Sequence, residues 1–153
     1  MIIASVSENK DFEKRISITP EISKKYINLG FEVHLSQNYG SHLGFSDSEY
    51  KELGVKIAGN ENELLESADV IIQMNLLNEN KTSLLKSNQT LIGVLNPYEN
   101  KKILDELIKK KINLFSLEML PRITRAQSMD VLSSQANLAG YKAVLESFSI
   151  YER

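Results

Sequence analysis

Short runs rich in valine and isoleucine alternate along this chain with segments of helical spacing, and this alternation limits the fold more than any other feature. Each run has the composition and length of a buried strand. The runs cover 2–6, 31–35, 70–72, 91–95 and 112–115. Strands that alternate with helices predict a mainly parallel sheet covered on both faces. We therefore expect an α/β fold of the Rossmann-like or flavodoxin-like type, with three αβα layers.

Capping and turn residues mark several helix boundaries. Thr19 can cap the start of the first helix, and Pro20 suits its first position because an N–H there would have no helical partner. Gly30 can adopt the left-handed conformation that ends a helix. A short helix is expected at 47–53, before Gly54. Helical spacing also appears in two later groups, which are Leu64, Leu65 and Ala68, and Ile103, Leu104, Leu107 and Ile108.

The pattern from about residue 130 to residue 153 is that of one long C-terminal helix. Small residues recur in it at helical spacing, namely Ala136, Ala139, Gly140 and Ala143. Small side chains let another backbone approach closely. Because glycine inside a helix costs about 1 kcal/mol relative to alanine, we expect close packing to compensate for Gly140.

Length and composition indicate a single globular domain spanning 1–153. The chain is 42% hydrophobic and 25% charged, and its net charge of -2 provides no excess to neutralise phosphates. We therefore expect no nucleic-acid partner. The lysines at 109–111 fit the end of a helix, where cations favour the dipole. The absence of cysteine excludes disulfides, and the apolar runs are too short for a signal peptide or a membrane span, so we expect no direct membrane insertion.

Several familiar catalytic motifs are absent. The seven glycines form neither a G-x-G-x-x-G fingerprint nor a P-loop, so the usual dinucleotide fingerprint is missing. The two histidines, His34 and His42, lack the spacing of a helical metal pair, and we expect no bound metal. The Gly-x-Ser-x-Gly nucleophile motif does not occur either, which leaves hydrolase chemistry without support.

A polar segment at 121–130, between the last expected strand and the long helix, carries the strongest functional signal. In open parallel sheets, ligands bind where the chain leaves the carboxyl end of a strand. Arg122 and Arg125 offer planar donors, Gln127 offers a donor pair and an acceptor, and Asp130 accepts hydrogen bonds. These groups suit a nicotinamide nucleotide. Spacing alone favours an ordinary alternative, in which Asp130 caps the helix and the arginines pair with nearby acids or carbonyls.

The residues that follow make this segment specific. The stretch from residue 121 reads PRITRAQSMDVLSSQANLAGYKA, and it resembles the signature of proton-translocating NAD(P) transhydrogenases, in the N-terminal domain of their NAD(H)-binding alpha subunit. This domain type is shared with alanine dehydrogenases. The similarity extends more loosely upstream, through 15–20, 29–33 and 91–95, and so covers essentially the whole chain.

The resemblance implies an oxidoreductase component in which Arg122, Gln127 and Asp130 form the catalytic set over the nicotinamide of NAD(H). Ser128, Met129 and Ser133 match further cofactor contacts. Gln127 is also expected to align the NADP(H) ring that a separate component presents. Direct hydride transfer between the two rings needs orientation rather than an acid or base from the protein.

Two alternatives remain open. The first is an amino-acid dehydrogenase of the alanine dehydrogenase type, in which an arginine at the position of Arg15 binds the keto acid. Gln73 stands where those enzymes have lysine, and Asn96 where they have histidine, so we assign Arg15 only a weak substrate role. The second alternative is a non-catalytic interaction domain that docks a partner through the polar segment and the small-residue helix.

The resemblance also implies partners. In the family an NAD-binding Rossmann domain with a glycine-rich turn follows this domain, and that domain is absent from this chain. An NADP(H)-binding component and a membrane component complete the proton-translocating enzyme. We expect a homodimer in the full-length protein, a cytoplasmic location peripheral to the inner membrane, and no activity of the chain alone.

Overall fold

The computed structural model describes residues 1–151. The chain divides into two compact units, Met1–Ser116 and Leu117–Arg153. The first unit holds the parallel sheet and its helices, and the second holds two short 3-10 turns and the long helix. Each unit is described by itself.

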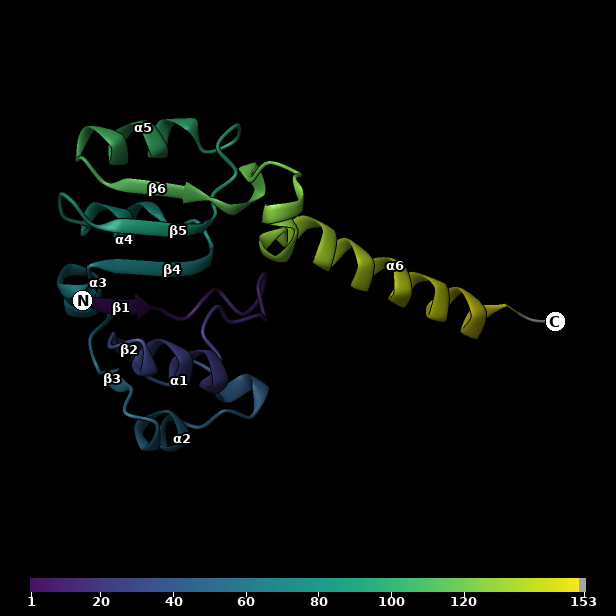
Figure 1. Ribbon diagram of the computed structural model, residues 1–153, viewed down its shortest axis with the longest axis horizontal. Helices are drawn as coiled ribbons and strands as arrows, with labels where there is room; N and C mark the ends of the chain where they lie inside the picture. The colour runs from purple at the N-terminus through teal and green to yellow at the C-terminus, as the bar shows by residue number, and fades with distance from the viewer. Residues whose placement is uncertain (152–153) are drawn as a thin grey trace. The chain divides into compact units, whose positions relative to one another are not determined.

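The first unit contains one sheet of six strands, all paired in parallel, in the order β3-β2-β1-β4-β5-β6 (Figure 1). The chain runs outward from β1 to β3 and then crosses back to β4, which lies beside β1. This strand order is that of the Rossmann fold, and it decides between the two fold types expected from the sequence. The strands are β1 (Ile2–Ser5), β2 (Glu32–Ser36), β3 (Lys56–Ala58), β4 (Val70–Asn75), β5 (Thr90–Val94) and β6 (Asn113–Ser116).

The helices of the first unit confirm most of the expected segments. They are α1 (Pro20–Asn28), the 3-10 turn η1 (Ser41–Leu43), α2 (Asp47–Glu52), α3 (Glu61–Ser67), α4 (Glu79–Ser83) and α5 (Lys101–Lys109). The sequence did not predict β3 or α4. The edge strand β3 has only the three residues Lys-Ile-Ala, and α4 is the polar run Glu-Asn-Lys-Thr-Ser, so neither shows hydrophobic periodicity.

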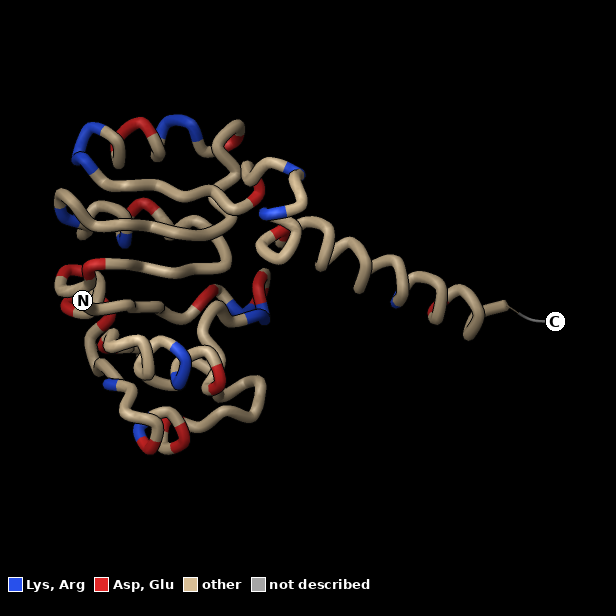
Figure 2. Tube along the Cα trace, in the orientation of Figure 1, with Lys and Arg blue, Asp and Glu red and all other residues tan. Residues whose placement is uncertain are grey.

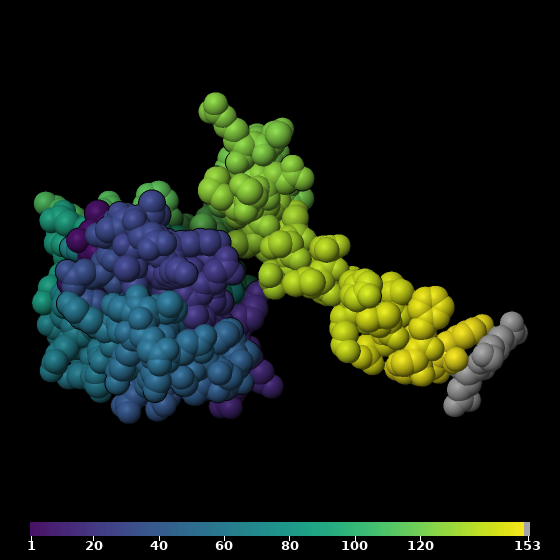
Figure 3. All heavy atoms as spheres, turned by 60° about the horizontal axis from the view of Figure 1, so that its bottom comes forward, coloured from purple at the N-terminus to yellow at the C-terminus, as the bar shows by residue number. Residues whose placement is uncertain are grey.

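Two apolar clusters fill the unit, and β1 separates them. Ile3 packs in one cluster and the next residue, Ala4, in the other, because successive strand side chains point to opposite faces. The first cluster includes Tyr39 and Tyr50 and is covered by α1 and α2. Figure 3 shows residues of this half, purple to blue, forming a continuous surface of the unit. The second cluster takes its helical residues from α3 and α5.

The expected boundaries of α1 are confirmed. The hydroxyl oxygen of Thr19 accepts a hydrogen bond from the N–H of Ile22, and Pro20 occupies the first helical position. Gly30 follows the helix with a φ of 87°. The lysine run also ends a helix as predicted, because α5 stops at Lys109 and Lys111 adopts a φ of 60°.

Gly93 lies where the backbones of β4 and β5 approach closely. A Cβ atom at this position would stand 2.6 Å from the carbonyl oxygen of Gln73. The register between the two strands shifts between Ile72 and Asn75, in the same stretch. Because the obstacle is backbone, a side chain at residue 93 requires the strands to separate.

We therefore predict that Gly93→Ala lowers the free energy of unfolding by about 1–3 kcal/mol, the usual cost of overpacking. Urea unfolding followed by circular dichroism measures this change. Gly59→Ala is the matched control, since nothing lies within 4 Å of its Cβ position and its φ is not positive, and its effect should stay within about 0.5 kcal/mol. Equal effects of the two substitutions would contradict the close approach.

The second unit contains η2 (Leu117–Met119), η3 (Thr124–Met129) and α6 (Val131–Ile150). The long helix is confirmed, and it is almost free of charge (Figure 2). Its two charged residues, Lys142 and Glu146, form an ion pair of 2.5 Å one turn apart. Nothing in the described part of the chain lies within 4 Å of the Cβ position of Gly140, so the close packing expected there stays a prediction. Across residues 1–151 no helix is both long and apolar enough to cross a membrane.

Candidate functional site

Four of the site residues predicted from the sequence line one pocket of the second unit. This loop pocket has a volume of about 320 Å³. It is lined by Pro121, Arg122, Ile123, Thr124, Ala126, Gln127, Asp130 and Ser133. The turn η3 forms because the N–H of Ala126 bonds to the carbonyl of Ile123, and buried Ala126 anchors the turn. The turn thereby brings Arg122 and Gln127 to the same cavity as the start of α6.

Asp130 caps α6 as the ordinary alternative predicted. Its Oδ1 accepts hydrogen bonds from the backbone N–H groups of Leu132 and Ser133, at 3.1 and 2.9 Å. The hydroxyl of Ser133 donates to Oδ2 at 2.6 Å. These bonds, with Ser133 contributing most and Arg122 adding to them, hold the pKa of Asp130 below its ordinary value. The cap therefore keeps an ionised carboxylate at the wall of the loop pocket.

The donors of the pocket are not committed to protein partners. Within residues 1–151, Arg122, Arg125 and the side chain of Gln127 form no salt bridge or hydrogen bond, so the arginine pairing of the ordinary alternative is not seen. Ser128 and Met129 lie on η3 but do not line the cavity, and Met129 is 53% exposed. The pocket can therefore offer a guanidinium and a side-chain amide to a polar planar ligand.

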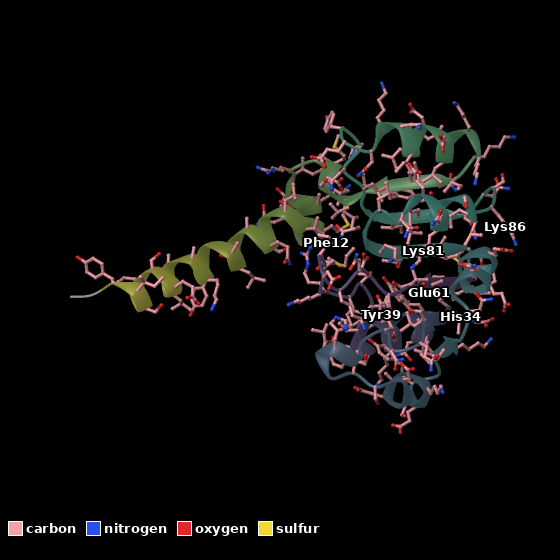
Figure 4. All side chains as sticks on the ribbon, turned by 180° about the vertical axis from the view of Figure 1, so that it is seen from behind. Phe12, His34, Tyr39, Glu61, Lys81 and Lys86 are labelled. Carbon is pink, nitrogen blue, oxygen red and sulfur yellow. The ribbon has the colours of Figure 1, made fainter. Side chains whose placement is uncertain are left out.

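The first unit has a second cavity, of about 420 Å³, beyond the carboxyl ends of β1 and β4. We call it the crossover crevice. Its lining residues are Ser7, Glu8, Asn9, Phe12, Glu13, Gln73, Asn75, Leu76, Leu77, Asn78 and Lys81. This is the point where the strand order reverses, and ligands of open α/β sheets bind there. Figure 4 shows Phe12 at the end of the sheet opposite to Lys86.

A buried hydrogen-bond network supports the crevice from below. The hydroxyl of Ser5 bonds to the Tyr39 hydroxyl at 2.8 Å and donates to Oε1 of Gln73 at 2.7 Å. The Tyr39 oxygen also accepts from the backbone N–H groups of Ser17 and Ile18. The amide of Gln73 donates to the carbonyl of Val6. Every polar atom of Gln73 thus has a partner, as burial requires.

Charged groups at the crevice are paired with one another. The Arg15 guanidinium donates to both carboxylate oxygens of Glu13, at 2.8 and 2.6 Å. This bidentate contact lowers the pKa of Glu13 to about 2. Across the crevice, Lys81 pairs with Glu61 at 2.7 Å (Figure 4). Arg15 therefore lies in the first unit with its charge balanced by Glu13.

The histidines have ordinary surroundings. A ring nitrogen of His42 lies 2.7 Å from the carbonyl oxygen of Lys14, and one of His34 lies 3.4 Å from a carboxylate oxygen of Glu32. In the part of the chain that the structure describes, no group of three or more metal-ligating side chains is found.

The family of the chain follows from comparison with known proteins. Residues 5–139 match the model of the alanine dehydrogenase/PNT N-terminal domain. The chain belongs to this family. It is 39% identical over 151 residues to the first segment of the split alpha subunit of the NAD(P) transhydrogenase of Rhodospirillum rubrum, and 36% identical over 157 residues to that of Rickettsia prowazekii. The crystal structure of the transhydrogenase from Sinorhizobium meliloti superposes with a TM-score of 0.90 at 35% identity.

The chain corresponds to only a portion of each relative. It is covered over 95% and 100% of its length by the two subunits, but it spans 39% and 41% of theirs. The superposition with the transhydrogenase structure covers 100% of this chain and 46% of the other. The resemblance deduced from the sequence of the long helix and the loop before it is thus confirmed for the family.

The crevice differs from what a keto-acid site of the alanine dehydrogenase type requires. Gln73 is only 3% exposed, and its amide is held within the network. The guanidinium of Arg15 is engaged by Glu13. Asn96 has a φ of 46° and accepts backbone hydrogen bonds from Glu99 and Asn100, so its carbonyl starts the turn toward α5. These contacts favour a structural role for all three residues.

Sequence reasoning missed two residues of the crevice, Glu8 and Tyr39. Glu8 binds the backbone at residues 74 and 75, and Tyr39 binds the loop at 17 and 18. The rule used for 121–130, that polar residues after a parallel strand mark a site, also applies to Glu8 after β1. No comparable signal marks Tyr39, because its partners depend on the folded sheet.

Proposed function

We propose that this chain is the N-terminal part of the NAD(H)-binding alpha subunit of a transhydrogenase that transfers hydride between NAD(H) and NADP(H). The observation that carries the proposal is the loop pocket, which gathers Arg122, Gln127, Asp130 and Ser133 in a protein of this family. The two transhydrogenase subunits to which the chain is similar over nearly its whole length support it.

The residues of the loop pocket fit the polar groups of a nicotinamide nucleotide. The side chains of Arg122 and Gln127 have no protein partners among the described residues, and a carboxamide needs both a donor and an acceptor. Asp130 and Ser133 present oxygen atoms at the same cavity. The bound nucleotides supply the hydride donor and acceptor. Arg122, Gln127 and Asp130 fix the orientation of the ring, with Ser128, Met129 and Ser133 as further contacts.

The proposal extends to the assembly. The pyrophosphate of NAD(H) is bound by a Rossmann domain outside this chain, since the chain has no glycine-rich phosphate turn. NADP(H) is presented by a separate component, and a membrane component couples the transfer to proton translocation. The complete protein is a homodimer on the cytoplasmic side, peripheral to the inner membrane. Arg15 stays outside the nucleotide contacts.

The role of Gln127 is tested in the complete enzyme. We predict that Gln127→Asn lowers the rate of hydride transfer from NADH to an NADP⁺ analogue by on the order of 100-fold, because the shorter side chain misplaces the reacting rings. NADH affinity should change little. Stopped-flow absorbance gives the rate, and Ser134→Ala serves as the control, because the Ser134 hydroxyl bonds within α6 to Val131. An unchanged transfer rate would refute the assignment.

The two possible functions of Asp130 can be separated by Asp130→Asn. Asparagine is as good a helix cap as aspartate, so the start of α6 is retained while the negative charge is lost. If Asp130 binds the nucleotide, NADH affinity of the complete protein falls about tenfold, as expected for a lost charged hydrogen bond. Isothermal titration calorimetry measures this. Unchanged affinity with an unchanged unfolding midpoint would reduce Asp130 to a cap.

The chain by itself should bind NADH weakly and carry out no transhydrogenation, because half of the nucleotide site lies in another domain. Titration with NADH up to millimolar concentration, followed by ¹⁵N NMR, should shift only resonances of residues near 121–133. Dissociation constants in the micromolar range would show that the site is complete without the second domain.

A further inference from the structure

Glu8 joins the loop after β1 to the end of β4. Its Oε1 atom accepts hydrogen bonds from the backbone N–H of Met74 at 2.7 Å, from the amide of Gln73 at 3.1 Å and from the backbone N–H of Asn75 at 3.3 Å. These donors lie where the register between β4 and β5 shifts. One carboxyl oxygen therefore fastens the loop 7–15 along one wall of the crossover crevice.

A second carboxylate stands beside this contact. Glu13, on the same loop, accepts from the side-chain amide of Asn75, so Glu8 and Glu13 share a partner residue. Arg15 is a cation of the same loop, and it binds Glu13. From α4, Lys81 reaches the crevice but pairs with Glu61. The contacts that β4 makes with Glu8 come from uncharged residues, so they hold the loop through hydrogen bonds rather than through an ion pair.

These surroundings separate the two carboxyl groups. Burial raises the pKa of Glu8, the N–H groups of Asn75 and Met74 act against this, and the charge of Glu13 raises it further. The pKa of Glu13 is lowered to about 2 by Arg15. Two carboxyl groups whose pKa values are driven apart in this way take different protonation states at the same pH. Glu8 is the one that holds a proton more tightly in the folded protein than in water.

We propose that Glu8 is a proton-linked latch, which in its neutral form holds the loop 7–15 against the end of β4 and releases the loop when it ionises. A neutral carboxyl group can still accept the three N–H bonds through its carbonyl oxygen, Oε1, with the proton on Oε2. On release the proton passes to solvent, and the ionised carboxylate gains hydration away from Glu13. The loop then uncovers the amide-lined wall of the crevice.

The direction of the pH dependence follows from linkage. Because the closed arrangement raises the pKa of Glu8, it binds the proton more tightly than the open one, and its stability falls as the pH rises through that pKa. The equilibrium between closed and open loop changes about tenfold for each unit by which the two pKa values differ. Acid therefore closes the latch, and a rise in pH opens it.

Amide hydrogen exchange of the whole chain, measured by NMR between pH 4 and 8, tests the latch. We expect the protection factors of Met74 and Asn75, corrected for intrinsic exchange, to fall severalfold as the pH rises. Glu8→Gln mimics the neutral acid, so its protection should stay high at every pH. Glu52→Gln, an exposed carboxylate on α2, is the matched control and should behave like the unchanged chain.

A second variant keeps the test independent of the first. Glu13→Gln removes the neighbouring charge and leaves Arg15 to face Glu8, and both changes lower the pKa of Glu8. The fall in protection should therefore begin at a lower pH than in the unchanged chain. Protection that rises with pH, a pH dependence that persists in Glu8→Gln, or an unmoved transition in Glu13→Gln would each overturn the proposal.

Discussion

The pairing of β1 with β4 is the contact on which the first unit depends. The chain returns to β1 after building two strands on its other side, so the central strand pair joins segments almost 70 residues apart. Both faces of β1 are covered by apolar clusters, which fixes the strand at the centre of the sheet. The same pairing places the ends of β1 and β4 next to each other. A crevice lined by both connections is the geometric result, and the polar groups at its base need the Ser5, Tyr39 and Gln73 network because they are buried there.

The strands that could be predicted were those buried on both faces, because such strands read as runs of valine and isoleucine. The edge strand β3 escaped prediction since its pairing with β2, rather than its own composition, defines it. Helix boundaries were predictable where a local capping bond exists, as at Thr19, and the polar helix α4 was not. Strand order followed from none of these local signals. It depends on which buried faces fit together, and it was expected only through the fold class.

The two cavities differ in the same respect. The loop pocket is made by residues within 13 positions of one another, so a local motif could indicate it, and its predicted members Arg122, Gln127, Asp130 and Ser133 do line one cavity. The crevice is made by segments 65 to 67 residues apart, and the partners of Glu8 could not be predicted without the sheet. Asp130 shows a further limit of sequence reasoning. Its cap occupies both carboxylate oxygens, yet it leaves the residue at the wall of the pocket, so the local structural role and the proposed ligand role involve the same atoms.

The composition of α6 has a practical consequence for the behaviour of the protein in solution. Large apolar side chains such as Leu138, Tyr141, Phe148 and Ile150 are each more than half exposed, while the pair Lys142 and Glu146 contributes no net charge. A helix that is apolar on all sides belongs in an interior, and extensive exposed apolar surface is a liability for aggregation. Purification of the chain without the rest of its protein is therefore a colloidal problem, in which yield and homogeneity depend on concentration, temperature and detergent rather than on the stability of the sheet.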